Sequence, residues 1–141
     1  MELRIEDSRC NKNDSRIVSE EKGRKHIANN INGKYDVRYY RLDGELVIRQ
    51  LCCDYLLVND STKKAYYIEL KGQDIQHAVD QVIAGEAICK DSLKGYTSFF
   101  RIIPHKSPTT RLMPVNFRHL LNNVGKKRLI CKNNVLEEDL D

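Results

Sequence analysis

Residues 54–72, DYLLVNDSTKKAYYIELKG, contain two apolar runs separated by a polar turn. Asn, Asp and Ser in the turn favour bonds between side chains and the local backbone. The flanking runs are short and rich in aromatic and β-branched residues, which predicts two strands paired antiparallel. Both strands are mostly apolar on both faces. The stretch therefore predicts the centre of a sheet that is covered on both sides.

Charged residues stand at the outer ends of this strand pair. Glu69 and Lys71 are two positions apart, so their side chains project from one face. Asp54 begins the first strand, and a turn of about four to five residues brings it beside the end of the second. Two carboxylates in this position form a site suited to Mg²⁺ or Mn²⁺. Lys71, on the same face, could hold an attacking water. The alternative is a Glu69–Lys71 surface ion pair worth about 0–1 kcal/mol.

The flanking sequence supplies further predicted elements. A helix is expected from Ser15 or Ser19 to about Asn30, on the basis of capping residues and an imperfect apolar stripe. The Asp43-Gly44 pair predicts a hairpin turn between strands YDVRYYRL and ELVIRQL. After Gly72 the apolar residues recur at the three- and four-residue spacing of a helix. The remaining predicted elements are a helix from an Asp74 cap to about Lys90, a strand TSFFRII, a helix from Pro114 to Gly125 and a strand RLIC.

Length and composition indicate one ordinary globular domain. The chain has 141 residues, of which 40% are hydrophobic and 31% charged, and we treat 1–141 as a single domain with a polar N-terminal segment and a short acidic C-terminal tail. We find no apolar run of about 20 residues and no secretory h-region, which argues against a membrane protein. Five cysteines without a CxxC pair favour a reducing compartment. We therefore expect a cytoplasmic protein.

Positive charge is concentrated near the end of the chain. Residues 92–136 contain no Asp or Glu. Their basic residues, named here the basic third, are Lys94, Arg101, Lys106, Arg111, Arg118, Lys126, Lys127, Arg128 and Lys132. Such a pattern favours binding of a polyanion, and nucleic acid is the partner we expect. The alternative is a basic surface that only balances the acidic tail.

Residues 53–72 followed by DIQHAVDQV resemble the core of the PD-(D/E)xK phosphodiesterase superfamily. The resemblance implies an α/β, restriction-endonuclease-like three-layer fold, with a central mixed sheet and an αβββαβ core flanked by helices. It also implies a divalent-metal-dependent nuclease that hydrolyses the phosphodiester bonds of nucleic acid, with DNA the favoured substrate. Carried over by position, Asp54 and Glu69 would be catalytic metal ligands, the Leu70 carbonyl a third ligand and Lys71 the catalytic lysine.

The same resemblance implies two further site residues. Many members carry a metal-binding glutamate on the first helix, for which Glu20 or Glu21 has a compatible position, although either could be a solvated acid at a helix start. Some branches place a catalytic glutamine on the helix after the lysine, which corresponds to Gln81. The tyrosine that often follows four residues later is replaced by Gly85.

Other functions fit the same residues. One is a catalytically inactive nuclease-fold module that binds nucleic acid or a protein partner, and another is a structural subunit that docks to an acidic protein. A chain of this size has little room for a separate targeting domain, so we also consider a homodimer in which substrate choice depends on the second copy. Metal-dependent cleavage distinguishes the first function from the others.

Overall fold

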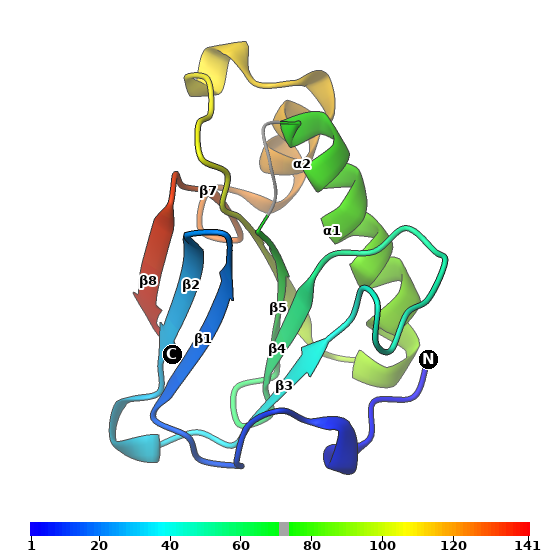
Figure 1. Ribbon diagram of the computed structural model, residues 1–141, viewed down its shortest axis with the longest axis vertical. Helices are drawn as coiled ribbons and strands as arrows, with labels where there is room; N and C mark the ends of the chain where they lie inside the picture. Colours follow the sequence, from blue (N-terminus) through cyan, green and yellow to red (C-terminus); the bar gives the residue numbers. More distant parts are fainter. Residues whose placement is uncertain (71–73) are drawn as a thin grey trace.

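The computed structural model describes residues 1–70 and 74–141, and its centre is a five-stranded mixed sheet (Figure 1). The strands lie in the order β3-β4-β5-β6-β7. Their bounds are β3 Val37–Arg41, β4 Tyr55–Asn59, β5 Lys64–Glu69, β6 Thr97–Ile102 and β7 Leu129–Cys131. The pairs β3–β4 and β4–β5 are antiparallel, whereas β5–β6 and β6–β7 are parallel. The expected central mixed sheet is confirmed.

The strands β4 and β5 form the antiparallel pair predicted from residues 54–72. Tyr55 pairs with Ile68 in their register. In the turn between them, the Asn59 side chain accepts a hydrogen bond from the backbone N–H of Ser61 at 3.1 Å. This is the local side-chain bonding that the turn composition favours.

Two α-helices make the crossovers that the parallel pairs require. Helix α1, Ile75–Cys89, joins β5 to β6, and helix α2, Val115–Val124, joins β6 to β7. Asp74 caps α1, because its side chain accepts the backbone N–H of His77 at 3.0 Å. Gly125 follows α2 with a φ of 86°. Both predicted helices are confirmed.

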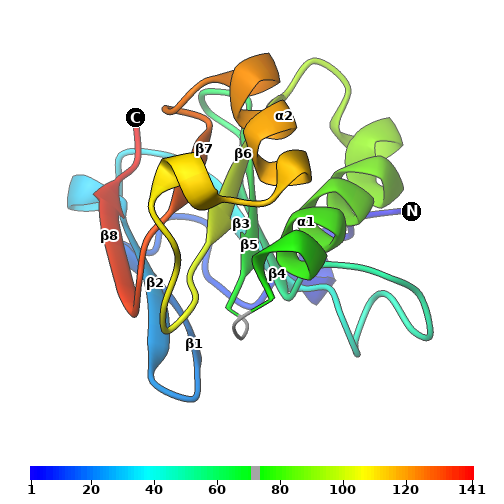
Figure 2. The same ribbon diagram turned by 90° about the horizontal axis from the view of Figure 1, so that it is seen from above.

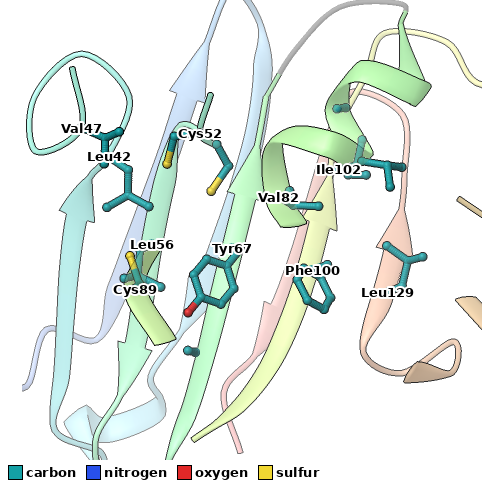
Figure 3. Close-up of a cluster of buried hydrophobic side chains, with 14 of the residues drawn as sticks. Leu42, Val47, Cys52, Leu56, Tyr67, Val82, Cys89, Phe100, Ile102 and Leu129 are labelled. Atoms are coloured by element: carbon teal, nitrogen blue, oxygen red, sulfur yellow. The ribbon is translucent and has the colours of Figure 1, made fainter. Parts of the chain in front are cut away.

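The helices pack on one face of the mixed sheet over a large apolar cluster (Figure 3). Leu56 on β4, Tyr67 on β5 and Phe100 on β6 meet Val82 and Cys89 of α1 in this cluster. The rings of Tyr67 and Phe100 stack with their centroids 5.9 Å apart. At about 25 cal/mol per Å² of buried apolar surface, this burial is a main source of stability.

A small three-stranded sheet covers the opposite face (Figure 2). Its strands are β1 Arg16–Glu21, β2 Arg24–Asn29 and β8 Val135–Asp139. The pair β1–β2 is antiparallel, and β8 from the acidic tail lies parallel to β2. The apolar side chains buried between the sheets include Ile17, Ala28, Tyr39, Leu57, Ile68 and Leu136. The molecule thus has three layers, but helices cover only one face of the central sheet and a second sheet covers the other.

The prediction of a first helix from Ser15 or Ser19 to about Asn30 is wrong. The hairpin β1–β2 occupies this stretch. Lys22 and Gly23 have positive φ values of 49° and 83°, as a two-residue turn between twisted strands requires. Alternate residues of β1, Ile17 and Ser19, are buried, so burial follows the two-residue period of a strand. The αβββαβ order therefore lacks its first helix.

The strand expected at residues 45–51 is also wrong, since this segment is a loop. The chain folds back directly after β3, where the backbone N–H of Val47 donates to the Leu42 carbonyl at 2.8 Å. Val47 is buried in the cluster beneath the helices, whereas Ile48 is exposed. The Asp-Gly turn signal is therefore real, but it opens a compact loop.

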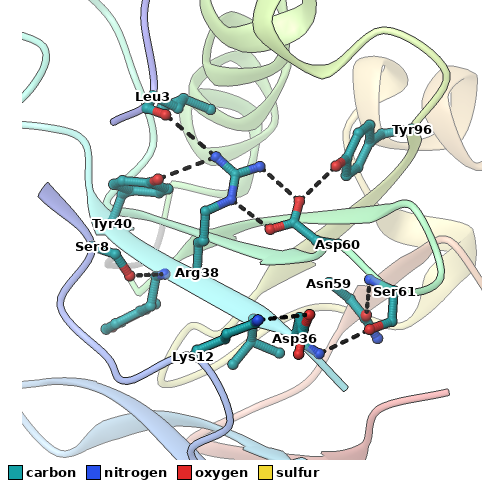
Figure 4. A network of polar contacts seen from close by, with 12 residues as sticks. Leu3, Ser8, Lys12, Asp36, Arg38, Tyr40, Asn59, Asp60, Ser61 and Tyr96 are labelled. Carbon is teal, nitrogen blue, oxygen red and sulfur yellow. Dashed lines mark hydrogen bonds and ion pairs between the residues drawn. The ribbon is translucent and has the colours of Figure 1, made fainter. Parts of the chain in front are cut away.

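A polar network fixes the edge strand β3 to the turn after β4 (Figure 4). Nε and Nη2 of Arg38 donate to the Asp60 carboxylate at 2.7 and 2.8 Å. The Tyr96 hydroxyl donates to the same carboxylate at 2.6 Å, and the Tyr40 hydroxyl accepts from Arg38 at 3.2 Å. Burial would raise the pKa of Asp60, but the bonds from Arg38 and Tyr96 lower it. Asp60 is therefore structural, and it lies at the end of β4 away from Asp54.

None of the helices in the described residues combines the length and apolarity needed to cross a bilayer. Cys10, Cys52, Cys53, Cys89 and Cys131 are free thiols. Burial raises the pKa of Cys89 to about 12, so this thiol stays protonated at neutral pH.

Candidate active site

Asp54 and Glu69, named here the carboxylate pair, lie side by side at one edge of the mixed sheet. The pairing of Tyr55 with Ile68 puts positions 54 and 69 opposite each other. The backbone N–H of Asp54 donates to Glu69 Oε1 at 3.1 Å, and the backbone N–H of Leu70 donates to Asp54 Oδ2 at 2.9 Å. The predicted juxtaposition is confirmed, while the role of these carboxylates as metal ligands stays a prediction.

Strand alternation places the carboxylate pair on the face that the helices cover. Leu56 and Tyr67, each two residues from one of the acids, belong to the cluster beneath α1. Asp54 is 3% exposed and Glu69 is 0% exposed. Because burying ionised carboxylates is costly without hydrogen bonds or counter-charges, the backbone bonds to both acids help to hold them there.

The same edge collects the carboxyl ends of the parallel strands β5, β6 and β7. Helix α1 starts there after Asp74, and the start of α2 lies beside it, since Asn116 Nδ2 donates to the Gln76 carbonyl at 2.8 Å. The loop after β6 meets the turn after β7, where His105 Nδ1 lies 3.1 Å from Asn134 Oδ1. Ligand sites in open α/β sheets lie outside the carboxyl ends of strands. The carboxylate pair occupies such a position.

The donor set of the carboxylate pair fits a hard divalent cation. Each carboxylate offers two oxygens, which are hard donors. Mg²⁺ is commonly held by one or two carboxylates together with waters and substrate phosphates. Within residues 1–70 and 74–141, no group of three or more His, Cys, Asp or Glu side chains is placed to hold a metal ion. A cation at the pair could take further ligands from backbone carbonyls, water and substrate.

The two residues after Glu69 were also predicted to belong to the site. The side chain of Leu70 packs in the cluster between the sheets, while its backbone N–H holds Asp54. A role of the Leu70 carbonyl as a metal ligand stays a prediction. Lys71, the expected catalytic lysine, lies outside the described residues, and its role likewise stays a prediction.

Helix α1 packs closely against the chain that leads into Asp54. Gln81 is buried, and its Nε2 donates to the Cys52 carbonyl at 3.4 Å, whereas its Oε1 has no hydrogen-bond partner among the described residues. At Gly85, a Cβ would lie 2.6 Å from Cys53 Sγ. A side chain at this position would therefore require Cys53 or the helix to move. Catalysis by Gln81 stays a prediction.

The prediction of a metal-binding glutamate on a first helix is wrong, because Glu20 and Glu21 lie on strand β1. Glu20 pairs with Lys25 at 3.5 Å, and Arg41 Nη2 donates to Glu21 at 3.3 Å. The Arg41 guanidinium lies over the Tyr55 ring on the side of the sheet that faces β1 and β2. Glu21 is thus on the face opposite the carboxylate pair and contributes no third ligand in this arrangement.

A buried ionic cluster lies between the two sheets, and it was not predicted from the sequence. Arg101, which is 2% exposed, donates from Nε and Nη2 to Glu138 at 2.7 and 3.0 Å. Its remaining N–H groups donate to three backbone carbonyls, which uses all of its donors. His26 Nε2 lies 2.7 Å from Glu138 Oε2. Arg101 is therefore structural, and it is removed from the phosphate-binding candidates of the basic third.

Burial would raise the pKa of Glu138, but the hydrogen bonds from His26 and Arg101 lower it to about 2. The cluster therefore contains an ionised carboxylate at neutral pH. It joins β2, β6 and β8, and so fixes the small sheet on the central one.

Comparison of the chain with protein-family models, with curated proteins and with solved structures finds no match. The functional interpretation consequently depends on the residues and on their geometry.

Proposed function

We propose that the protein is a divalent-metal-dependent nuclease, with DNA as the first substrate to test, built on a variant of the restriction-endonuclease-like fold. The observation that carries the proposal is the juxtaposition of Asp54 and Glu69 at the carboxyl edge of a mixed βββαβ sheet. In this variant, the hairpin β1–β2 takes the place of the first helix. The exposed residues of the basic third supply charge that could hold a nucleic-acid backbone.

In the proposed mechanism, the carboxylate pair holds Mg²⁺ or Mn²⁺. When bound, such an ion lowers the pKa of a bound water and neutralises charge on the phosphate. Lys71 orients the attacking water through its ammonium group, and the amide of Gln81 orients the water or the substrate. The backbone N–H of Leu70 keeps the Asp54 carboxylate in position, and the Leu70 carbonyl adds a neutral oxygen ligand.

The test is cleavage of single-stranded, duplex and branched DNA and of RNA, in Mg²⁺, in Mn²⁺ and in a chelator. Asp54→Asn and Glu69→Gln keep side-chain size and remove charge, and each should lower the cleavage rate by about 100-fold or more. Glu21→Gln is the matched control, since it removes the same charge on the opposite face of the sheet and should cleave normally. Metal-dependent cleavage that persists in both site variants would refute the site.

Calorimetry with Mn²⁺ supplies a readout that does not depend on turnover. The wild-type protein should bind the ion, and Glu69→Gln should bind it at least about tenfold more weakly, because a ligand carboxylate is lost. Equal affinity in the two proteins would place the ion elsewhere.

A second candidate is an inactive nuclease-fold module that binds nucleic acid or a protein partner. The burial of both carboxylates and their backbone bonds favour it, because these contacts already give the pair a structural role in joining the start of β4 to the end of β5. This candidate predicts nucleic-acid or protein binding without measurable affinity for divalent ions. The same calorimetry distinguishes it from the nuclease.

A further inference from the structure

A pocket of about 740 Å³ opens on the face of the mixed sheet opposite the carboxylate pair. Tyr66 and Phe99, neighbours on β5 and β6, line it with rings stacked at a centroid distance of 4.8 Å. Lys64, at the first position of β5, also lines the pocket, whereas Glu69 is the last residue of that strand. At about 3.3 Å per residue, Lys64 and Glu69 are roughly 17 Å apart along the strand. The pocket is therefore separate from the candidate active site.

The size of the pocket falls within the range of about 300–1,000 Å³ typical of small-molecule sites. Phe99 is only partly buried, so its ring can meet a ligand. The ring is stacked on Tyr66, and the Arg101 guanidinium and the Lys64 ammonium lie 5.5 and 5.6 Å from its centroid. The part of the ring that these groups leave accessible suits a planar base, since packing of a nucleobase on an aromatic side chain is worth about 1–3 kcal/mol.

Lysines supply the positive rim. Lys126 and Lys127 are exposed in the connection between α2 and β7, and neither ammonium makes a hydrogen bond or ion pair within the described part of the chain. Lys64 Nζ lies 5.6 Å from the Phe99 ring centroid and 2.7 Å from Asp141 Oδ1. The Asp141 side chain is 77% exposed, so this ion pair is weak and a phosphate can compete for Lys64.

Acidic side chains also line the pocket, and one of them, Asp141, lies next to Lys64. Asp139 and Asp141 line the pocket from the end of the chain, and carboxylates there can accept hydrogen bonds from hydroxyl or amino groups. Ammonium groups act as point charges suited to phosphate, whereas a planar carboxylate ligand is better matched by a guanidinium fork. Two guanidinium groups line the pocket: Arg101 has all its donors in use, and Arg128 donates from Nε to the Ser98 carbonyl at 2.8 Å. The lining therefore combines a stacking face, phosphate-type cations and hydroxyl acceptors.

We propose that this pocket binds a nucleoside phosphate. The base stacks on Phe99, the phosphate lies between Lys126 and Lys127, and the sugar hydroxyls face Asp139 and Asp141. A free mononucleotide and one internal nucleotide of a DNA chain share the base and the phosphate, whereas only the free mononucleotide also offers sugar hydroxyls to Asp139 and Asp141. The site needs neither the carboxylate pair nor a metal ion, so it stands independently of the proposed nuclease activity.

The experiment titrates the protein with adenosine monophosphate and with a short single-stranded deoxyadenosine oligonucleotide, in chelator, and follows binding by calorimetry and amide chemical shifts. Lys126→Gln/Lys127→Gln and Phe99→Leu should each weaken binding about tenfold or more. The matched control is Lys90→Gln/Lys94→Gln, which removes the same charge from exposed residues outside the pocket and should change affinity by less than about twofold.

Thermal unfolding of each variant checks the fold, and Phe99→Tyr, which keeps the ring, should retain binding. Binding of either ligand that follows this pattern supports the pocket. The mononucleotide alone indicates a free nucleotide, and the oligonucleotide alone indicates a nucleic-acid chain. No binding of either ligand at millimolar concentration, or equal weakening by the control, overturns the proposal. Glu69→Gln should bind as wild type, so a failed nuclease test leaves this result unaffected.

Discussion

Replacement of Gly85 by alanine tests how closely α1 approaches the candidate site. Helix propensity alone favours alanine over glycine by about 1 kcal/mol inside a helix. In the structure, however, the added Cβ would lie 2.6 Å from Cys53 Sγ and 3.5 Å from Tyr67 Cδ1. Cys53 is fully buried at the entry to β4, so its sulfur has little space to move. Overpacking of this kind costs about 2–3 kcal/mol, and we expect a net loss of about 1–2 kcal/mol for Gly85→Ala.

Urea unfolding measures this change as a shift of the midpoint at unchanged slope. The matched variant is Cys53→Ala, which removes the sulfur that the new methyl group would meet. In the Cys53→Ala background, Gly85→Ala should be neutral or stabilising by up to about 1 kcal/mol, because the propensity gain is then unopposed. Stabilisation by Gly85→Ala in the wild-type background would refute the close approach of α1 to Cys53.

Three other substitutions test the fold. The lowered pKa of Glu138 means that its stabilisation is fully present above about pH 4.5 and is lost as the pH falls toward about 2, so Glu138→Gln should flatten the acid-unfolding curve followed by circular dichroism over that window. Arg38→Lys removes the two-pronged bond to Asp60 and should cost about 1–2 kcal/mol in urea unfolding, with cleavage unchanged. Gly23→Ala should destabilise by about 1 kcal/mol because of its φ of 83°, whereas a helix at this position would gain stability.

The central strand pair could be predicted because its signals are local. The turn that contains Ser61, the apolar strands and the acids at their ends all lie within residues 54–72, so the hydrophobic pattern and the turn length set the register that brings Asp54 opposite Glu69. Helix α1 was predictable for the same reason, since its Asp74 cap and apolar spacing are contiguous.

The hairpin β1–β2 was missed because its apolar residues fit two periods. Ile17, Ile27 and Ala28 are compatible with an imperfect helical stripe, but in the structure they lie on the strands β1 and β2, and Ile17 and Ala28 pack in the cluster between the sheets. The discriminating signal was Gly23, which follows Lys22 in the middle of the stretch and is costly inside a helix. A glycine in that place should have favoured a turn.

The addition of β8 could not be predicted from local sequence. His26 and Glu138 meet across a separation of 112 residues, and parallel pairing leaves no turn signal between its strands. The acidic composition of the C-terminal tail therefore predicted a segment exposed to solvent. In the structure Leu136 is buried and Glu138 neutralises Arg101, so part of the tail's negative charge belongs to the interior.

The ion pair between Arg101 and Glu138 also changes which residues of the basic third are available to bind phosphate. With Arg101 committed to Glu138, the exposed cations divide between two edges of the central sheet. Lys106 lies in the loop after β6, at the carboxyl edge that holds the carboxylate pair, whereas Lys126 precedes β7 at the opposite edge. Exposed charges separated by more than about 10 Å are largely screened from each other at ordinary ionic strength, so cations at the two edges contribute independently to binding. Neutralising Lys106 should therefore weaken nucleic-acid binding near the carboxylate pair without changing nucleotide binding in the pocket, and neutralising Lys126 should do the reverse.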